Sequence, residues 1–336
     1  NIIRGIETYA TGAKLSSPVT HAINFEGNLL TYLQRVGEKA LVGAQLAVET
    51  GNLELGARTF WNAWGTRQGL KDAVKKMVFE LTSSTPGLER ATSELAKKRA
   101  MKPSPLPKYL RWTNPFRLLS ASDGFAKALL KDSAINERAL QLAAEEGLTG
   151  KKLTARTREL AQNPLDEWVK EAARVGLEYT YQAAPDRVLN AISKIQEIPL
   201  IGRLLFPFVR TPYNLFKEQL KRTPLGAIRM LEKRYRTDPI YRREVNAQVG
   251  MGTALAAGAY LMVDNNEVTG QLPDDPNERA LWRAEGRQPH SIKVGDRWVQ
   301  YNRVQPVGQY LAQAAELHKA LKEGNEMKAQ ELAGRL

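Results

Sequence analysis

The chain has no cysteine among its 336 residues and only three histidines. The absence of cysteine excludes disulfides, thiolate metal sites and cysteine nucleophiles together. His21, His290 and His318 lie far apart in sequence, and none has a second ligand at the spacing of a zinc-binding helix motif. We therefore expect structural or surface roles for the histidines, and no bound metal or cofactor.

Motifs for nucleotide binding and nucleophilic catalysis are also missing. The glycines form no Walker-type loop, no paired-glycine dinucleotide fingerprint and no nucleophile elbow. The acidic pairs 145–146 and 274–275 are adjacent in sequence, so their members do not share a helical face, and solvated helix ends and turns explain them better than acid–base chemistry. We expect no catalytic residue in this segment. The chain begins at Asn1 without a methionine or a leader, and we expect it to be an internal piece of a longer protein.

Acidic residues are outnumbered by basic ones. Lysine and arginine total 49 against 36 aspartates and glutamates, a net charge of +13. Such a surplus favours polyanionic partners, either nucleic acid or anionic lipid. The alternative is a solubilising surface, or basic patches matched by acidic regions of a longer chain. A composition with 43% apolar and 25% charged residues is ordinary for a folded protein.

Most of the chain has helical periodicity. Leu29, Leu33, Val36, Ala40 and Leu41, for example, fall on one helical face at steps of three and four residues. We expect a mainly α fold, an elongated multi-helix array or bundle with one small β-hairpin near residues 291–301. The predicted helices are 20–50, 55–81, 86–99, 122–146, 163–183, 224–236, 239–263 and one beyond Pro306.

Prolines divide the chain into regions. Four prolines within residues 101–117 predict a lapse in regular structure, and the aromatic residues among them favour an ordered strap over a flexible linker. Pro207 and Pro212 predict short helical pieces joined at bends in 199–221. The expected regions are an N-terminal helical region (1–100), the strap (101–117), a central helical region (118–264) and a C-terminal region of hairpin and helices (265–336).

The helix predicted at 163–183 has signals at both ends. Asn163 and Pro164 suit an N-cap and a first helical turn, while Gly147 and Gly150 suit the stop and turn that precede it. Its expected buried face comprises Leu165, Trp168, Val169, Ala172 and Leu177.

A single segment reads as sheet. Residues 291–294 and 297–301 have alternating apolar positions, and Gly295-Asp296 between them forms a two-residue hairpin turn. An isolated hairpin is marginally stable, so we expect this one to lie on a helical core.

The strongest signal for binding is a basic stretch from Arg203 to Arg243. It holds eleven Lys or Arg residues against three acidic ones, and six aromatic residues are interleaved with them. Contact with phosphates through such a stretch is independent of base sequence and sensitive to salt. The alternative is that the aromatic residues are core and the basic side chains are the wet side of amphipathic helices. The candidate polyanion-binding residues are Arg203, Arg210, Lys217, Lys221, Arg222, Arg229, Lys233, Arg234, Arg236, Arg242 and Arg243.

An uncharged run follows the basic stretch. Residues 249–263 are fifteen residues without a charge, rich in Gly and Ala. A membrane-spanning helix needs about 20 apolar residues, so a buried core helix is favoured. The alternative is that the basic belt and this helix together attach to an anionic membrane surface.

Four sequence blocks, in this order along the chain, resemble one family. The first is LSSPVTHAIN (15–24) with GN (27–28) beyond it, and the second is DGF (123–125) with EGLTG (146–150) and NP (163–164). The third is PFVRTPYN (207–214) with RTPLG (222–226), and the fourth runs from 275–282 to QPHSI (288–292) and the strand 298–301. The positions that carry the resemblance are Pro18, His21, Asn24, Asp123, Gly124, Phe125, Pro207, Phe208, Arg210, Thr211, Pro212, Asn214, Pro224, Gln288, Pro289 and Ser291.

These blocks look like those of the large internal virion, or genome-ejection, proteins of tailed bacteriophages and the related polyvalent proteins of mobile elements. The sequence departs from that pattern at Gly286-Arg287, where an aromatic residue would precede the Gln-Pro pair. The resemblance implies a helical, oligomeric protein that is stored inside the capsid and released ahead of the genome.

After release, the resemblance implies assembly with copies of itself and with other ejection proteins into a conduit across the host cell envelope, in the periplasm and inner membrane. The implied partner is double-stranded DNA, bound without base specificity, with contact to the bacterial membrane as a further possibility and no small-molecule substrate. The alternatives are a scaffold region of a larger virion enzyme, peptidoglycan-cleaving or RNA polymerase, and a peripheral membrane module.

Overall fold

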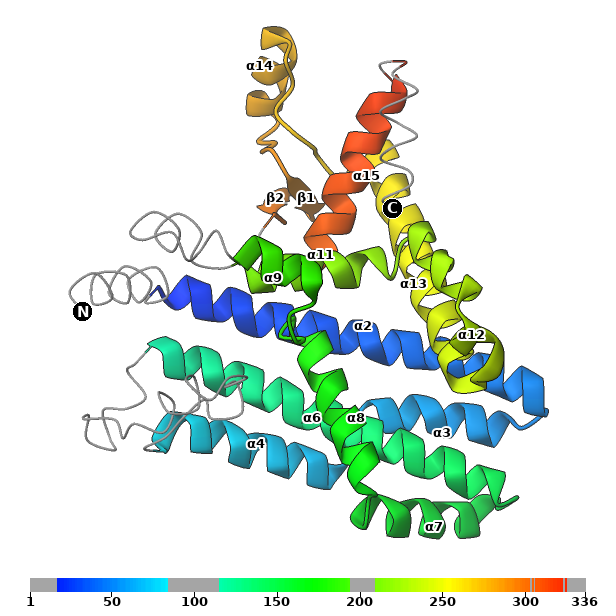
Figure 1. The fold of residues 1–336 in the computed structure, drawn as a ribbon. Coiled ribbons are helices and arrows are strands. Elements are labelled where there is room, and N and C mark those ends of the chain that lie inside the picture. Colours follow the sequence, from blue (N-terminus) through cyan, green and yellow to red (C-terminus); the bar gives the residue numbers. More distant parts are fainter. Residues whose placement is uncertain are drawn as a thin grey trace. The chain divides into compact units, whose positions relative to one another are not determined.

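The computed structural model describes residues 17–83, 115–193, 209–302, 304, 306–322 and 324. In that part of the chain, helices account for most residues, and the strands are the two of one antiparallel hairpin (Figure 1). The predicted fold class, mainly α with one small hairpin, is confirmed. The predicted helix at 86–99 and residues 101–114 of the predicted strap lie outside the described residues.

Contacts divide the chain into two compact units. The first comprises Asn1–Val36 and Leu46–Phe216, and the second comprises Gly37–Gln45 and Lys217–Leu336. Helices α2 (Pro18–Thr50) and α11 (Arg210–Leu220) each contribute residues to both units.

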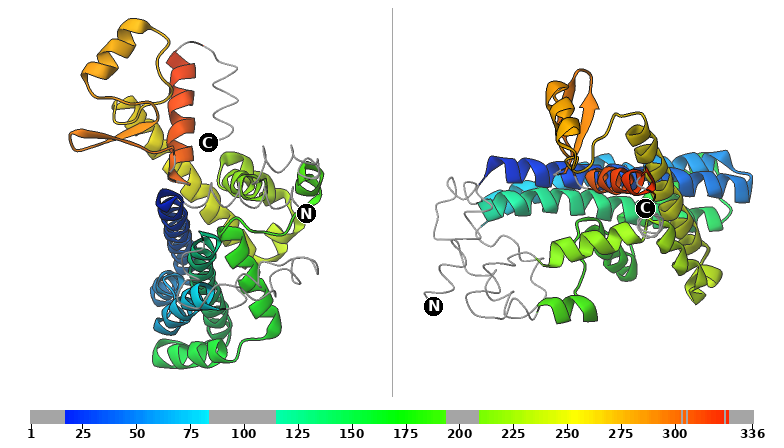
Figure 2. Two further views of the ribbon diagram at one scale, coloured as in Figure 1. Left: turned by 90° about the vertical axis from the view of Figure 1, so that its left-hand side faces the viewer. Right: turned by 90° about the horizontal axis from the view of Figure 1, so that it is seen from above.

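The first unit is organised around one long helix, α6 (Pro115–Glu145), which is hydrogen-bonded to α2 and packs against four further helices of the described chain (Figures 1 and 2). These four are α3 (Leu53–Ala63), α4 (Arg67–Thr82), α7 (Gly150–Gln162) and α8 (Asp166–Tyr179), and the short α9 (Arg187–Ser193) follows α8. Two apolar clusters form the core, and α6 contributes to both. One contains Tyr32, Val36, Ala63, Leu130 and Tyr179, and the other Leu46, Leu55, Leu140, Ala143 and Leu153.

The single helix predicted at 55–81 is wrong, because the structure has α3 and α4 there. Gly65 has φ +75°, a left-handed conformation that ends α3. Thr66 then caps α4, since its hydroxyl accepts a hydrogen bond from the Gly69 amide at 2.9 Å. The Asp132 carboxylate of α6 accepts a hydrogen bond from the Thr66 amide at 2.7 Å, so a tertiary contact fixes the break between α3 and α4.

The predicted roles of Asn163 as an N-cap and of Gly150 as part of a turn are also wrong. Gly150 begins α7, which the sequence had not predicted, and Asn163 ends it, with its amide donating to the Glu159 carbonyl. Helix α8 therefore starts only at Asp166. Leu165 is 59% exposed, whereas Trp168 and Ala172 are buried as predicted.

Two further differences between the predicted and the observed helices involve prolines in a first helical turn. Helix α6 begins at Pro115, seven residues before the predicted start at 122, and α11 runs through Pro212 without a bend. A proline in the first turn of a helix removes an amide that has no intrahelical partner, so both positions tolerate it.

The second unit packs two long helices together. Helix α13 (Pro239–Asp264) and α15 (Val307–Lys322) share an apolar cluster of small and aromatic residues, which includes Ala256, Ala259, Val263, Tyr310 and Ala314. Before α13 the chain forms the 3₁₀ helix η4 (Pro224–Leu231) and α12 (Lys233–Thr237), where one α-helix over 224–236 had been predicted. Asp238 caps α13 by accepting hydrogen bonds from the amides of Ile240 and Tyr241.

The hairpin lies where it was predicted. Strand β1 (Ser291–Val294) pairs with β2 (Arg297–Gln300), and Gly295 in the turn has φ +59°. Thr269 anchors the hairpin: its amide donates to the Ser291 carbonyl at 2.8 Å, and its hydroxyl accepts from the Ser291 amide at 2.9 Å. Tyr301, directly after β2, joins the apolar cluster of α13 and α15. Helix α14 (Pro276–Ala284) precedes β1 in the chain.

The uncharged run 249–263 is part of α13, and one face of it is buried. Gly252, Ala256, Ala259 and Val263 lie on that face, while Leu261 on the other side is 61% exposed. Of the helices that the structure describes, none combines the length and the apolar character needed to span a membrane.

Two glycines of α13 predict opposite effects of the same substitution. A Cβ at Gly252 would overlap the carbonyl oxygen of Arg222, so Gly252→Ala is expected to cost about 1–3 kcal/mol through overpacking. A Cβ at Gly258 would meet nothing within 4 Å, so Gly258→Ala is expected to stabilise the protein by about 0.5–1 kcal/mol through helix propensity. Urea unfolding of both variants measures the two effects. The same sign for both would contradict the close contact at Gly252.

Candidate polyanion-binding surfaces

The structure divides the predicted basic stretch into buried and exposed residues. Arg203 lies outside the described residues, as does the side chain of Arg210, the first residue of α11. The nine remaining candidates, from Lys217 to Arg243, all belong to the second unit.

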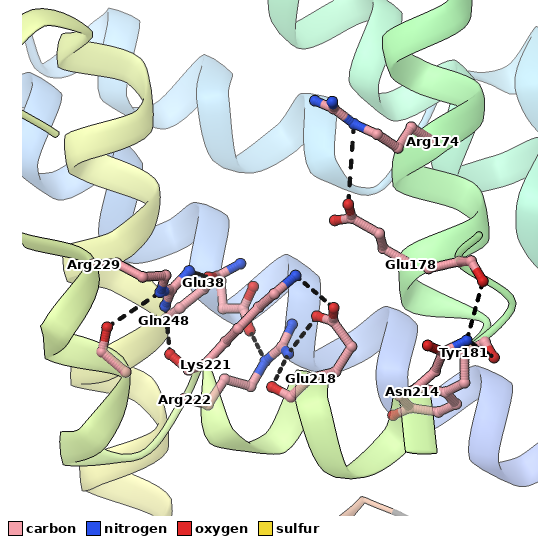
Figure 3. A network of polar contacts seen from close by, with 12 residues as sticks. Glu38, Arg174, Glu178, Tyr181, Asn214, Glu218, Lys221, Arg222, Arg229 and Gln248 are labelled. Carbon is pink, nitrogen blue, oxygen red and sulfur yellow. Dashed lines mark hydrogen bonds and ion pairs between the residues drawn. The ribbon is translucent and has the colours of Figure 1, made fainter. Parts of the chain in front are cut away.

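Arg222 is the centre of a buried ionic cluster (Figure 3). Its Nε donates to Oε1 of Glu38 at 2.6 Å, and its Nη1 donates to the Glu218 carbonyl at 2.8 Å and to Glu218 Oε2 at 3.2 Å. The Lys221 ammonium pairs with Glu218 Oε1 at 2.5 Å. Arg222, Glu38 and Glu218 are each at most 5% exposed, so the Arg222 guanidinium binds inside the protein and is not presented to a ligand.

Arg229 is likewise used internally. Its guanidinium donates to Gln248 Oε1 at 2.7 Å, to the Gly226 carbonyl at 3.2 Å and to the Lys221 carbonyl (Figure 3). Burial lowers the pKa of Arg229 below its usual range. These contacts join η4 to α13 and to the end of α11.

The candidates that face solvent are concentrated on α12. Lys233, Arg234 and Arg236 are exposed. Arg234 pairs with Asp238 at 3.2 Å and lies over the Tyr241 ring at 4.5 Å, with about half of its side chain still exposed at 49%. Lys217 is exposed too, while Arg242 and Arg243 are partly exposed.

The first unit has a basic cleft that no pattern in the sequence indicates. It has a volume of about 1250 Å³ and lies among α3, α4, α6, α7 and α8. Six basic and two acidic side chains line it. The basic residues are Arg58, Arg67, Lys76, Lys127, Lys131 and Arg158, and the acidic ones are Asp72 and Asp132.

Three of the six basic residues of the cleft are engaged with neighbours. Arg58 donates to Glu54 at 2.6 Å and to Thr154 at 2.7 Å. The hydrogen bond from Arg58 to Glu54 holds the pKa of Glu54 below its usual range. Lys127 donates to Gln182 at 2.6 Å, and Lys76 lies 3.5 Å from a Glu80 carboxylate oxygen.

The other three, Arg67, Lys131 and Arg158, are exposed and form no ion pair with any residue in the described part of the chain. Both acidic residues of the cleft have local partners: Asp132 accepts from Thr66 and Asn136, and Asp72 accepts from Gln68. The cleft therefore presents three exposed cations to a ligand.

Residues from three of the four family-like blocks come together in the first unit. Asn24 and Asn28 donate to Asp123 Oδ1 at 3.2 and 3.0 Å, and Gln182 donates to Asp123 Oδ2. Asn214 donates to the carbonyls of residues 181 and 183, on either side of Gln182 (Figure 3).

This network holds an unusual turn after α8. Tyr181 has φ +56°, which a residue with a side chain rarely adopts, and its carbonyl accepts from Asn214 while its hydroxyl lies 3.0 Å from Thr31. Asp123 and Asn214 thus have clear structural roles within the first unit.

The other family-like positions are dispersed. Gly124 and Phe125 follow Asp123 in α6, and Gly124 also lines the basic cleft. Pro224 begins η4, and Gln288 accepts through its carbonyl from the Thr269 hydroxyl beside the hairpin. The first turn of α2 contains Pro18 and His21, and that of α11 contains Thr211 and Pro212. The hairpin region contains Pro289 and Ser291. The described residues do not include Pro207 and Phe208.

The histidines lie in separate places. His21 is in α2 of the first unit, while His290 precedes β1 and His318 lies 3.2 Å from Asp264 in the second. Among the described residues, no three His, Asp or Glu side chains are grouped so that they could hold a metal ion.

Comparisons with known proteins place the chain in no family. No family model, no curated protein and no solved structure matches it.

Proposed function

We propose that this chain is a structural segment of an ejection protein of a tailed bacteriophage. In this proposal it assembles with copies of itself or with partner proteins into a conduit that delivers the viral genome across the host cell envelope. It acts by assembly and by contact with DNA phosphates, and this segment catalyses no reaction.

The basic cleft of the first unit is the observation that supports DNA contact best. Arg67, Lys131 and Arg158 come from three helices, α4, α6 and α7, and all three line the same cleft. Because no carboxylate of the described chain pairs with them, a phosphate can take the place of water and counterions without breaking an ion pair. Gln68 and Asn62 add neutral amide groups to the same lining.

Contact of this kind suits a protein along which DNA moves. Phosphate contacts position a nucleic acid but carry no base information. Binding through a few exposed cations is weak at physiological salt and allows sliding. The four family-like blocks supply the more specific part of the proposal, namely a phage ejection protein.

Removal of the three exposed cations of the cleft should weaken DNA binding. The variant Arg67→Ala, Lys131→Ala, Arg158→Ala is expected to bind a random duplex roughly tenfold less tightly at low salt, with a salt slope smaller by about 2–3. The measurement is a fluorescence titration of labelled duplex at two salt concentrations.

The matched control is Lys151→Ala, Lys152→Ala, Lys170→Ala. These three lysines are exposed, belong to the same unit and do not line the cleft. Both triple variants lower the net charge equally, so only the place of the charges differs. Equal DNA affinity of the two variants would remove the cleft from the proposal.

A further inference from the structure

The 3₁₀ helix η4 presents a line of aliphatic side chains to solvent. Leu225, Ile228 and Leu231 are 53%, 70% and 74% exposed. A 3₁₀ helix has three residues per turn, so side chains spaced by three stack in one row. Gly226 on another side of η4 is buried, and a Cβ there would overlap the backbone of Lys221. The row of Leu225, Ile228 and Leu231 is called the aliphatic ridge below.

Cations lie directly beside the aliphatic ridge. Helix α12 begins two residues after the ridge ends and contacts η4, and it carries the exposed Lys233, Arg234 and Arg236. Lys233 and Arg236 form no ion pair with any residue that the structure describes. Both side chains extend into solvent from a short helix.

Acidic residues do not cancel this charge. Residues 224–243 contain six basic side chains and two acidic ones, Glu232 and Asp238. Glu232 accepts a hydrogen bond from the Tyr241 hydroxyl at 2.9 Å, and Asp238 caps α13 while it pairs with Arg234. Both carboxylates thus have partners, and the surplus of positive charge remains beside the ridge.

The combination fits an anionic lipid bilayer better than other partners. A duplex would satisfy the cations but would leave three aliphatic side chains in water. A protein partner is typically anchored by aromatic side chains in pockets, but Tyr235 and Tyr241 here are tied to Asn246 and Glu232 by their hydroxyls. A bilayer surface accepts aliphatic side chains at the acyl boundary and cations among its anionic headgroups.

We propose that η4 and α12 form a docking surface for an anionic membrane. Leu225, Ile228 and Leu231 enter the interface, and Lys233, Arg234 and Arg236 contact the headgroups. The identification of this membrane as that of the host cell rests on the proposed function. Contact at the surface needs no helix that spans the bilayer.

Vesicle flotation of the full chain tests the ridge. Phosphatidylcholine vesicles with phosphatidylglycerol are expected to carry the wild type, and vesicles of phosphatidylcholine alone are not. The variant Leu225→Ser, Ile228→Ser, Leu231→Ser is expected to bind the anionic vesicles at least about tenfold more weakly. The control Leu261→Ser, Leu281→Ser, Val294→Ser changes aliphatic residues of the same unit with 61%, 55% and 59% exposure, and it should float as the wild type does.

A second pair of variants tests the charges. Lys233→Gln with Arg236→Gln is expected to weaken flotation roughly tenfold or more, whereas Lys293→Gln with Arg297→Gln, also exposed and in the second unit, should leave it unchanged.

The proposal is overturned if the ridge variant floats as the wild type does, or if neutral vesicles carry the wild type equally well. A loss of DNA affinity in both surface variants with unchanged flotation would assign the surface to nucleic acid instead. A change in oligomeric state with unchanged flotation would assign it to contact between copies. The proposed function is tested separately, because the cleft variants are measured on DNA without lipid.

Discussion

Replacement of Arg222 by Met should lower the free energy of unfolding of the second unit by about 3–5 kcal/mol. Met keeps much of the side-chain volume but removes the charge and the hydrogen bonds to Glu38 and Glu218. Those two glutamates are 2% and 5% exposed, so they would stay buried with less cationic compensation. The cost of an unmatched buried charge exceeds the cost of a lost surface pair.

The partners of Arg222 give the matched controls. Glu38→Gln in the Arg222→Met background removes one of the unmatched charges, so it should recover part of the lost stability. Arg236→Met changes an exposed arginine of the same unit without an ion pair in the described chain, and should change stability by less than about 0.5 kcal/mol. Hydrogen exchange of the α13 amides in increasing urea reports the second unit alone. Equal stability of Arg222→Met and Arg236→Met would show that the buried cluster contributes little.

The role of Arg222 also shows what a charge count could and could not predict. The run from Arg203 to Arg243 predicted one polyanion surface, because sequence shows charge but not burial. Arg222 and Arg229 bind partners inside the protein that the local sequence does not indicate. For Arg222 one of these is Glu38, 184 residues earlier, and for Arg229 it is Gln248. Lys233 and Arg236 remain exposed because they lie on α12, a five-residue helix of which no residue is buried.

The basic cleft had no signal in the sequence. Arg67, Lys131 and Arg158 are separated by 64 and 27 residues, and each is one unremarkable cation on a helix surface. Only the packing of α4 and α7 against α6 brings them to one place. The hairpin, in contrast, was predicted to within one residue, because the Gly295-Asp296 turn and the alternating strands are local signals.

Helix boundaries show the same distinction. The long helices α2 and α13 follow continuous periodicity, and their predicted ends lie within two residues of the observed ones. The break between α3 and α4 depends on Asp132, a residue of another helix that binds the Thr66 amide and hydroxyl. A contact of this kind cannot be read from the local pattern.

The second large effect is expected at Arg35 in the first unit. Its Nη2 donates to both carboxylate oxygens of Glu137 at 3.1 Å, and its guanidinium lies over the Tyr179 ring at 5.1 Å. Arg35 is 3% exposed, and Ser133 donates a further hydrogen bond to Glu137 at 3.0 Å. Arg35→Met should therefore destabilise the first unit by about 3–5 kcal/mol, since it leaves a buried carboxylate without its cation. Urea unfolding followed by hydrogen exchange of the α6 amides measures the loss.

Two comparisons separate the buried pair from the rest of the packing. Arg174 is 60% exposed and lies 3.6 Å from Glu171, so Arg174→Met should cost at most about 1 kcal/mol. The double variant Arg35→Met, Glu137→Leu replaces both charges by apolar groups, so it should be more stable than Arg35→Met alone. A double variant that lost the sum of the two single effects would mean that Arg35 and Glu137 stabilise the unit independently, and that their ion pair is not what holds α2 to α6.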